Sequence, residues 1–191
     1  KELPSLAADF SSLAKGFASD ELSALLTSLG ATHHLVQIGG DIKTSGAPAP
    51  ATGWRTMIES PLTSSNSQPA ALVLLHGEAL STSGDTHNFF TVADRRYGHV
   101  IDPRTGEPVN GPLASVSVIA PTCAQSSSLA TALFVLGAEA GYRFAIEHNI
   151  AALFLVRDHS NGALLHRPTP AFSHFATKAP SALPLTAPVA H

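Results

Sequence analysis

The stretch from residue 98 to residue 110 constrains the fold more than any other part of the chain. It begins like a strand at β-branched Ile101, but Pro103 lacks a backbone donor and disfavours helix for the residue before it. Proline followed three positions later by glycine predicts a tight turn. Three polar side chains leave this strand end within a few residues: His99, Asp102 and Arg104. The stretch is either an ordinary polar turn or part of a site.

Length and composition exclude several classes of protein. The 191 residues suit one domain or one and a half, with 44% hydrophobic and 13% charged residues. A net charge of −3 without a basic run argues against nucleic-acid binding. Cys123 is the single cysteine, which excludes an internal disulfide framework. No apolar run approaches the ~20 residues that span a bilayer, and no signal peptide is visible at Lys1, so an N-terminal segment could have been removed.

Three helices are predicted, at about residues 9–29, 124–136 and 139–147. The first carries one apolar stripe at helical spacing: Leu22, Leu25, Leu26 and Leu29. Its small residues Ala14, Gly16 and Ala18 fit either a tight packing seam or the close approach of an anion to a helix start. Gly30 and Gly137 are the predicted helix ends.

Strands are predicted where apolar residues alternate, or run together, between turn residues. They fall at 35–38, 53–59, 71–75, 89–92, 97–101, 114–120, 150–156 and 163–166. Strands at 89–92 and 97–101 would form a hairpin with a turn at 93–96, and residues 62–69 an exposed loop. Strands mixed with helices, without regular βαβ alternation, predict an α+β fold with a largely antiparallel sheet. We assign residues 1–177 to the domain and the Pro/Ala-rich residues 178–191 to a loose tail.

Spacing argues against three familiar kinds of site. None of the ten histidines has the spacing of a helical zinc motif. The nucleophile elbow of Ser-His-Asp hydrolases and the glycine fingerprint of dinucleotide-binding folds are both absent. What remains is a set of strand ends and helix starts, where backbone amides can hold a phosphate-bearing ligand. These are residues 9–18, 38–41, 81–85, 99–106 and the helix start after Thr122.

These stretches resemble, in order, the motifs of the ApbE-type FAD:protein FMN transferases. Asp9 to Ala18 is similar to the family's Asp-Leu-Gly-Gly-Ile-Ala-Lys-Gly-Tyr-Ala, and Ile38 to Ile42 is similar to Leu-Gly-Gly-Asp-Ile. Ser81 to Asp85 and Tyr97 to Gly106 resemble Ala-Thr-Ser-Gly-Asp and Tyr-Ser-His-Ile-Ile-Asp-Pro-Arg-Thr-Gly. Ser127 to Gly137 resembles Asp-Ala-Leu-Ala-Thr-Ala-Leu-Phe-Val-Leu-Gly.

The resemblance implies a flavin transferase domain of the T-fold type. Such an enzyme splits FAD at its pyrophosphate and attaches FMN, through a phosphoester, to a Thr or Ser of an acceptor protein. The implied catalytic residues are His99 as base or orienter, and Asp102 and Arg104 holding the loop or a phosphate. The implied FAD contacts are Lys15, Gly16, Gly39, Gly40, Asp41, Ser83, Gly84 and His99. The implied Mg²⁺ ligands are the side chains of Ser127 and Thr131 and the carbonyl of Ala14.

Two departures from the family pattern modify this expectation. Ser127 stands where the family has a metal-binding Asp, and a neutral hydroxyl replaces a carboxylate poorly in Mg²⁺ binding. The family's N-terminal segment, which adds flavin contacts, is expected to be missing before the Asp9 motif. The alternative function is therefore a FAD-binding or partner-binding homologue with impaired catalysis. The family also implies a bacterial envelope location, on the periplasmic side of the inner membrane with a lipid anchor.

Overall fold

The computed structural model describes residues 7–61, 68–85, 89–92, 95–158, 160 and 163–177. The predicted tail at 178–191, most of the predicted 62–69 loop and residues 93–94 of the predicted turn lie outside them. In chain order the elements are α1 (Ser11–Ser28), β1 (His34–Ile38), β2 (Asp41–Ser45), β3 (Trp54–Ile58), β4 (Ala71–Leu75), β5 (Ala79–Gly84), β6 (Phe89–Val92), β7 (Arg95–Gly98), β8 (Leu113–Ala120), α2 (Cys123–Glu147), β9 (Ala151–Arg157), β10 (Leu164–Pro168), the 3-10 helix η1 (Ala171–His174) and β11 (Ala176–Thr177).

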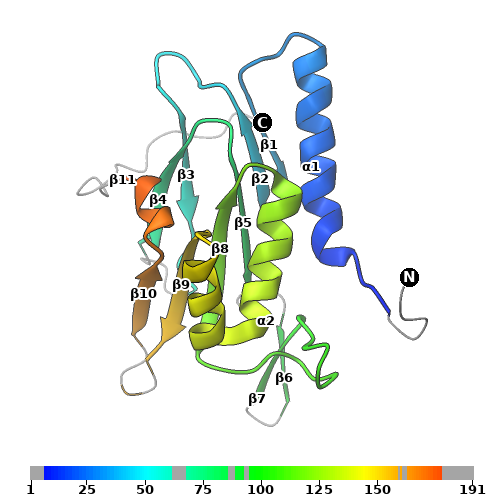
Figure 1. Cartoon of the computed structure of the whole chain (residues 1–191), viewed down its shortest axis with the longest axis vertical. Helices are drawn as coiled ribbons and strands as arrows, with labels where there is room; N and C mark the ends of the chain where they lie inside the picture. The colour runs from blue at the N-terminus through cyan, green and yellow to red at the C-terminus, as the bar shows by residue number, and fades with distance from the viewer. Residues whose placement is uncertain are drawn as a thin grey trace.

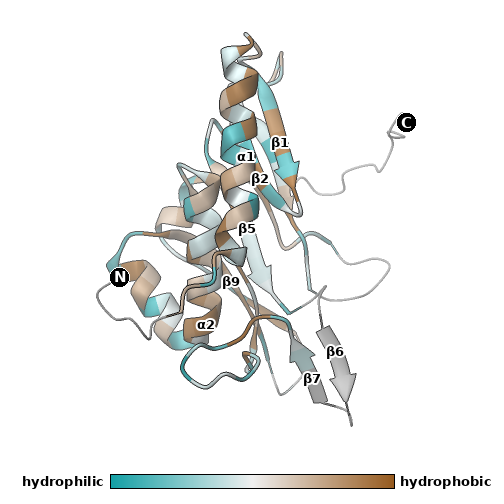
Figure 2. Cartoon of the chain, turned by 90° about the vertical axis from the view of Figure 1, so that its right-hand side faces the viewer, coloured by the Kyte–Doolittle hydropathy of each residue, from teal (hydrophilic) through white to brown (hydrophobic). Residues whose placement is uncertain are grey.

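Most of the described elements form three layers, with a six-stranded sheet in the middle. Its strand order is β1-β2-β5-β8-β9-β10, and every neighbouring pair is antiparallel. Helices α1 and α2 cover one face, as Figures 1 and 2 show from two directions. On the other face, the small sheet β11-β4-β3 and the helix η1 pack against the same strands. The predicted α+β fold with an antiparallel sheet is confirmed.

The core explains why β8 and β9 lie at the centre. All eight residues of β8 are buried, as expected of a strand covered on both faces. In β9 the side chains alternate: Ala152 and Phe154 pack toward the helices, whereas Leu153 and Leu155 pack toward the small sheet. Phe172 of η1 is 2% exposed and packs in the same cluster as Leu153 and Leu155. The packed domain therefore continues past β10.

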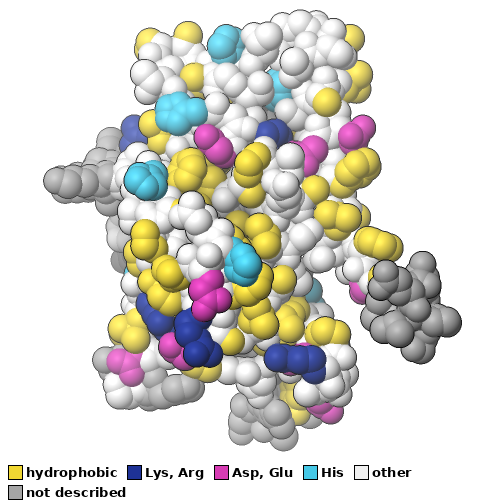
Figure 3. Space-filling view, in the orientation of Figure 1, with side chains coloured by type: hydrophobic (Ala, Val, Ile, Leu, Met, Phe, Trp, Pro, Cys, Tyr) yellow, Lys and Arg dark blue, Asp and Glu magenta, His cyan; other side chains and the backbone are white. Residues whose placement is uncertain are grey.

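Helix α1 buries small and polar residues and exposes most of the leucine stripe that was predicted to be its apolar face. Leu25 and Leu29 are 54% and 73% exposed, while the buried residues of α1 are Gly16, Ser19 and Ser23. Figure 3 shows hydrophobic side chains along the outer edge formed by this helix. The buried face is small because α2 lies directly against it: a Cβ built on Gly16 would stand 2.4 Å from the carbonyl oxygen of Cys123. The sequence alternative of a helix–sheet seam at the small residues is therefore wrong in its partner: Gly16 packs against α2, and Ala14 and Ala18 are exposed.

Helix α2 contains the predicted break. Gly137 has φ 84° and ψ 179°, which interrupts the helix between the two predicted segments. By length and composition alone α2 could cross a membrane, although no apolar run in the sequence predicted such a segment. Within the domain, however, Ala130, Leu133 and Phe134 pack in the core against the sheet. Its apolar character is therefore explained as that of a core helix.

Two strands of the main sheet were not predicted as strands. β2 follows a turn at Gly39 and Gly40, whose φ values of +54° and +93° fit the two-residue hairpin turn that pairs Ile38 with Asp41. β5, taken from the sequence only as a motif, pairs with both β2 and β8. Both strands are rich in hydroxyl and charged residues, so their apolar alternation is weak.

The 98–110 stretch differs from its prediction in one respect. The hairpin β6–β7 is present, but β7 begins at Arg95 and ends at Gly98, so His99 and Val100 lie beyond the strand. The chain then doubles back, with a bridge between Ile101 and Pro108. The strand shifts because its partner β6 pairs Val92 with Arg95, two residues earlier than expected.

Candidate functional site

A cavity of about 960 Å³ opens between the start of α1, the β1–β2 turn, the end of β5, the first turns of α2 and the segment after β7. This volume lies at the upper end of the usual range for small-molecule sites. Predicted site residues that line it are Lys15, Gly39, Gly40, Asp41, Ser83, Gly84, His99, Ser127 and Thr131. Side chains from all five motifs therefore converge on one cavity.

Four predicted site residues are not among those lining the cavity: Ala14, Gly16, Asp102 and Arg104. Gly16 instead faces the first turn of α2. Asp102 and Arg104 lie in the turn behind the cavity, although Pro103 between them does line it. The lining also includes polar residues that the sequence analysis did not assign: Ser11, Ser12, Gln37, Thr82 and Ser115.

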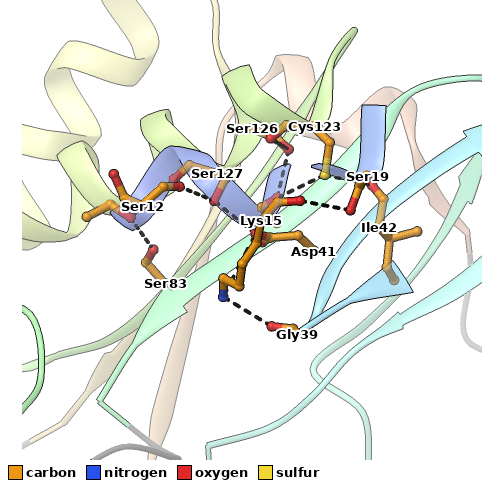
Figure 4. Close-up of polar contacts among 12 residues, drawn as sticks. Ser12, Lys15, Ser19, Gly39, Asp41, Ile42, Ser83, Cys123, Ser126 and Ser127 are labelled. Atoms are coloured by element: carbon orange, nitrogen blue, oxygen red, sulfur yellow. Dashed lines mark hydrogen bonds and ion pairs between the residues drawn. The ribbon is translucent and has the colours of Figure 1, made fainter. Parts of the chain in front are cut away.

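Ser127 is the centre of the polar contacts on the helix side of the cavity (Figure 4). Its hydroxyl lies 2.6 Å from the carbonyl oxygen of Ser12 and 3.0 Å from Oδ2 of Asp41. Asp41 is 3% exposed, and its nearest cation is Lys15, with Nζ 3.9 Å from the same oxygen. Lys15 also donates to the carbonyl of Gly39. These contacts join α1, the β1–β2 turn and α2.

Hydroxyl groups of β5 pair with hydroxyls on both of its faces. Three neighbouring positions make such contacts at 2.7–2.8 Å: Ser81 with Ser126, Thr82 with Ser117, and Ser83 with Thr131. Two of these partners lie on α2 and one on β8. Because buried polar groups are satisfied here by uncharged partners, β5 can be polar without introducing charge into the core.

The residues implied as Mg²⁺ ligands do not fit that ion. The hydroxyl of Thr131 donates to the carbonyl of Ser127 and contacts Ser83, while that of Ser127 is held by Ser12 and Asp41. Ala14 lies inside α1, where a backbone carbonyl accepts a hydrogen bond of the helix. Among the described residues, no group of three or more His, Cys, Asp or Glu could hold a metal ion. The set offers neutral oxygens only and lacks the carboxylates that Mg²⁺ prefers.

Asp102 and Arg104 hold the turn that carries His99. Arg104 donates from Nε and Nη2 to both carboxylate oxygens of Asp102, and its backbone N–H binds Oδ1. Hydrogen bonds from this guanidinium lower the pKa of Asp102 from 3.8 to about 2. Nη2 of Arg104 also reaches the carbonyl of Val135 on α2. Of the two predicted roles, holding the loop is the one these contacts support.

Two contributions to the site were missed in the sequence. The carbonyl that meets Ser127 belongs to Ser12, which was quoted within its motif but given no role. Asp20 was not singled out, although both of its carboxylate oxygens bind backbone amides at the start of α2. This capping contact could not be predicted from the sequence, because Asp20 is about a hundred residues away from the amides it binds.

Fold and cavity together define an α+β domain with a large cavity lined from both helices and from β2, β3 and β5. The ApbE family model matches residues 1–154. The chain belongs to the ApbE family.

The relatives are proteins named FAD:protein FMN transferase. The one from Haemophilus influenzae is 36% identical over 157 residues, covering 82% of this chain and 45% of the relative. The one from Escherichia coli K12 is 34% identical over 158 residues, covering 83% and 45%. The chain thus spans about half the length of the curated relatives it matches.

Solved structures agree with this assignment. The flavin transferase ApbE from Vibrio cholerae superposes with a TM-score of 0.77 at 32% identity, covering 92% of this chain and 54% of that one. The apo form of the flavinyl transferase ApbE from Pseudomonas stutzeri gives a TM-score of 0.76 at 38% identity, covering 88% and 51%. The recognition of the family from its five motifs is confirmed.

Proposed function

We propose that this domain binds FAD in the 960 Å³ cavity and takes part in transferring FMN from it to a Thr or Ser of an acceptor protein. The observation that carries the proposal is the convergence of residues from all five motifs on that cavity. The activity for which relatives at 34–36% identity are named supports it.

The reaction breaks and forms one bond to phosphorus. The acceptor hydroxyl oxygen attacks the FMN phosphorus, the bridging oxygen of the pyrophosphate leaves with AMP, and the hydroxyl proton goes to a base. His99 is the proposed base, since it is exposed, lines the cavity and lies three residues before the Asp102–Arg104 turn. Lys15 is the cation proposed to offset negative charge on the phosphates, because its Nζ lies at the cavity.

We propose further that Mg²⁺ binds weakly to this chain. The family's ion would be held by the hydroxyl oxygens of Ser127 and Thr131, which are neutral where Mg²⁺ prefers carboxylates. No step above therefore depends on it. By family resemblance alone, the proposed location is the periplasmic side of the bacterial inner membrane, with a lipid anchor.

The test is to incubate the purified chain with FAD, with and without Mg²⁺, and to measure two products. AMP release reports cleavage of the pyrophosphate, and flavin fluorescence on a denaturing gel reports covalent FMN on an added acceptor protein. FAD binding with both products supports the transferase. FAD binding with neither product supports the impaired homologue, and absence of FAD binding refutes the flavin proposal.

A further inference from the structure

The start of α2 is closed by a side chain from α1. The backbone N–H groups of Cys123 and Ala124 donate to Oδ1 and Oδ2 of Asp20, at 2.8 and 2.9 Å. The next amide, of Gln125, donates to the hydroxyl of Thr122, which is the N-cap residue of the helix. The first-turn amides of α2 are therefore occupied by protein groups, so the predicted phosphate position at the helix start after Thr122 is filled.

A second contact fixes the same two helices. Gly16 lies one turn before Asp20, on the same side of α1, and its Cα meets the carbonyl of Cys123 so closely that a Cβ would lie 2.4 Å from that oxygen. A glycine thus admits the backbone of α2, and a carboxylate one turn later binds its amides. The negative charge of Asp20 also interacts favourably with the positive end of the α2 dipole.

These contacts of Gly16 and Asp20 with the start of α2 form a joint between the two helices. The joint matters because α1 and α2 form two walls of the cavity. Ser12 and Lys15 line it from α1, and Ser127 and Thr131 line it from α2, whereas Asp20 does not line it. The buried face of α1 holds only Gly16, Ser19 and Ser23, so apolar packing contributes little to its position. The distance between the walls must then depend on polar contacts such as those of Asp20.

We propose that Asp20 is a positioning residue: by binding the first amides of α2, it sets the separation of the two helical walls and thereby the affinity for FAD. The inference rests on the proposed function in taking FAD as the ligand. The position of α1 against α2 can be measured without any ligand, however, because Cys123 is the single cysteine and is buried at this joint. Burial also raises the pKa of its thiol, which slows its reaction with thiol reagents.

The experiment compares Asp20→Ala, Asp20→Asn and the control Glu21→Gln, which removes the charge of the exposed neighbouring residue on α1. FAD affinity is measured by quenching of flavin fluorescence, and access to Cys123 by the rate of reaction with Ellman's reagent. Losing both capping bonds should weaken FAD binding and speed thiol labelling by about tenfold or more in Asp20→Ala. Asp20→Asn should lie between Asp20→Ala and wild type, since its amide oxygen can accept only as a neutral group. Glu21→Gln should match wild type.

A merely structural role predicts a different result. In that case both readouts of Asp20→Ala would change only in proportion to its globally unfolded fraction, measured by thermal unfolding, and the proposal would be overturned. Gly16→Ala is a second variant, which displaces α1 while keeping Asp20, and it should change both readouts in the same direction. If wild type binds no FAD, the proposed function fails, and labelling alone decides the joint: faster labelling of folded Asp20→Ala supports it, and an unchanged rate refutes it.

Discussion

The hydroxyl of Ser127 lies 2.6 Å from the carbonyl oxygen of Ser12, so α2 and the first turn of α1 are joined directly. The same hydroxyl lies 3.0 Å from Asp41. A neutral group thus stands beside a buried carboxylate, at the position where the family carries a second acidic residue. With Ser127 at this position, a hydroxyl rather than a second carboxylate lies directly beside Asp41.

This contact predicts how Ser127→Asp behaves. The new carboxylate would stand beside Asp41, and two adjacent carboxylates repel unless a cation or a proton is bound between them. Without Mg²⁺ the variant should unfold at a lower temperature than wild type. With Mg²⁺ at about 100 times its dissociation constant it should regain ~2.7 kcal/mol. Ser127→Ala, which removes the hydroxyl without adding charge, should not respond to Mg²⁺. Tight calorimetric Mg²⁺ binding by wild type would contradict this account.

His99→Ala should abolish most of the proposed transfer. His99 is exposed on the cavity and lies beyond the end of β7, and thermal unfolding of the variant separates a loss of stability from a loss of transfer. Loss of a general base should lower the rate of flavin transfer by ~10²-fold or more. His166→Ala, on the exposed side of β10, is the matched control. Transfer at the wild-type rate by the His99 variant would remove histidine from the mechanism.

Gly40→Val should weaken FAD binding by placing a side chain in the cavity. A Cβ on Gly40 would meet no protein atom, so the new side chain would project into open space that the ligand is proposed to fill. Its φ of +93° also strains any residue with a Cβ. Gly30→Val provides the control, because Gly30 has a φ of +89° and equally open surroundings but does not line the cavity. Equal FAD affinities for the two variants would show that only backbone strain matters.

The Asp102–Arg104 pair predicts a pH dependence. Because the pKa of Asp102 in the folded protein is lowered from 3.8 to about 2, its carboxylate stabilises the turn fully above about pH 4. That contribution should be lost as the pH falls from about 4 toward about 2, where the unfolded chain binds the proton first. The urea midpoint of wild type minus that of Asp102→Asn should therefore shrink over this interval. A difference independent of pH would mean that the ion pair contributes nothing to the turn.

The packing of α1 predicts unequal effects of two substitutions on the same helix. Leu25→Gln should change the free energy of unfolding by no more than about 0.5 kcal/mol, because Leu25 is already 54% exposed. Ser23→Leu should cost ~1–3 kcal/mol, since Ser23 is buried and its hydroxyl contacts Nε2 of His34 at 2.7 Å. Urea unfolding of both variants measures the difference. A larger loss for Leu25→Gln would restore the leucine stripe as the buried face.

Features set by local sequence could be predicted. The continuous apolar run at residues 150–156 marks β9, and Gly137 marks the break in α2, because each depends on residues within a few positions. Most cavity residues could likewise be named from their motifs, since each motif is contiguous. β2 was missed because Asp41, Lys43 and Thr44 are polar and find their partners in other elements.

Features set by distant partners could not. Periodicity showed that the leucines of α1 share one side but not which side is buried. That choice depends on Gly16 and Asp20 meeting Cys123 and Ala124, about a hundred residues later. The same limit applied to Ser12, whose carbonyl has a role only because α2 brings Ser127 to it. Gly16 illustrates the point: its motif predicted a ligand contact, whereas the space it leaves is filled by protein.

The small buried face of α1 also determines the order in which parts of this domain open. Local opening costs least where little apolar surface is buried, and α1 buries two serines and a glycine while the β8–β9 pair buries nearly every residue it has. In native-state hydrogen exchange, the amides of α1 should lose protection well before those of β8 and β9. A bound ligand that contacts Ser12 and Lys15 would then stabilise α1 against local opening. The amide exchange of this helix should therefore slow more on binding than that of any other element.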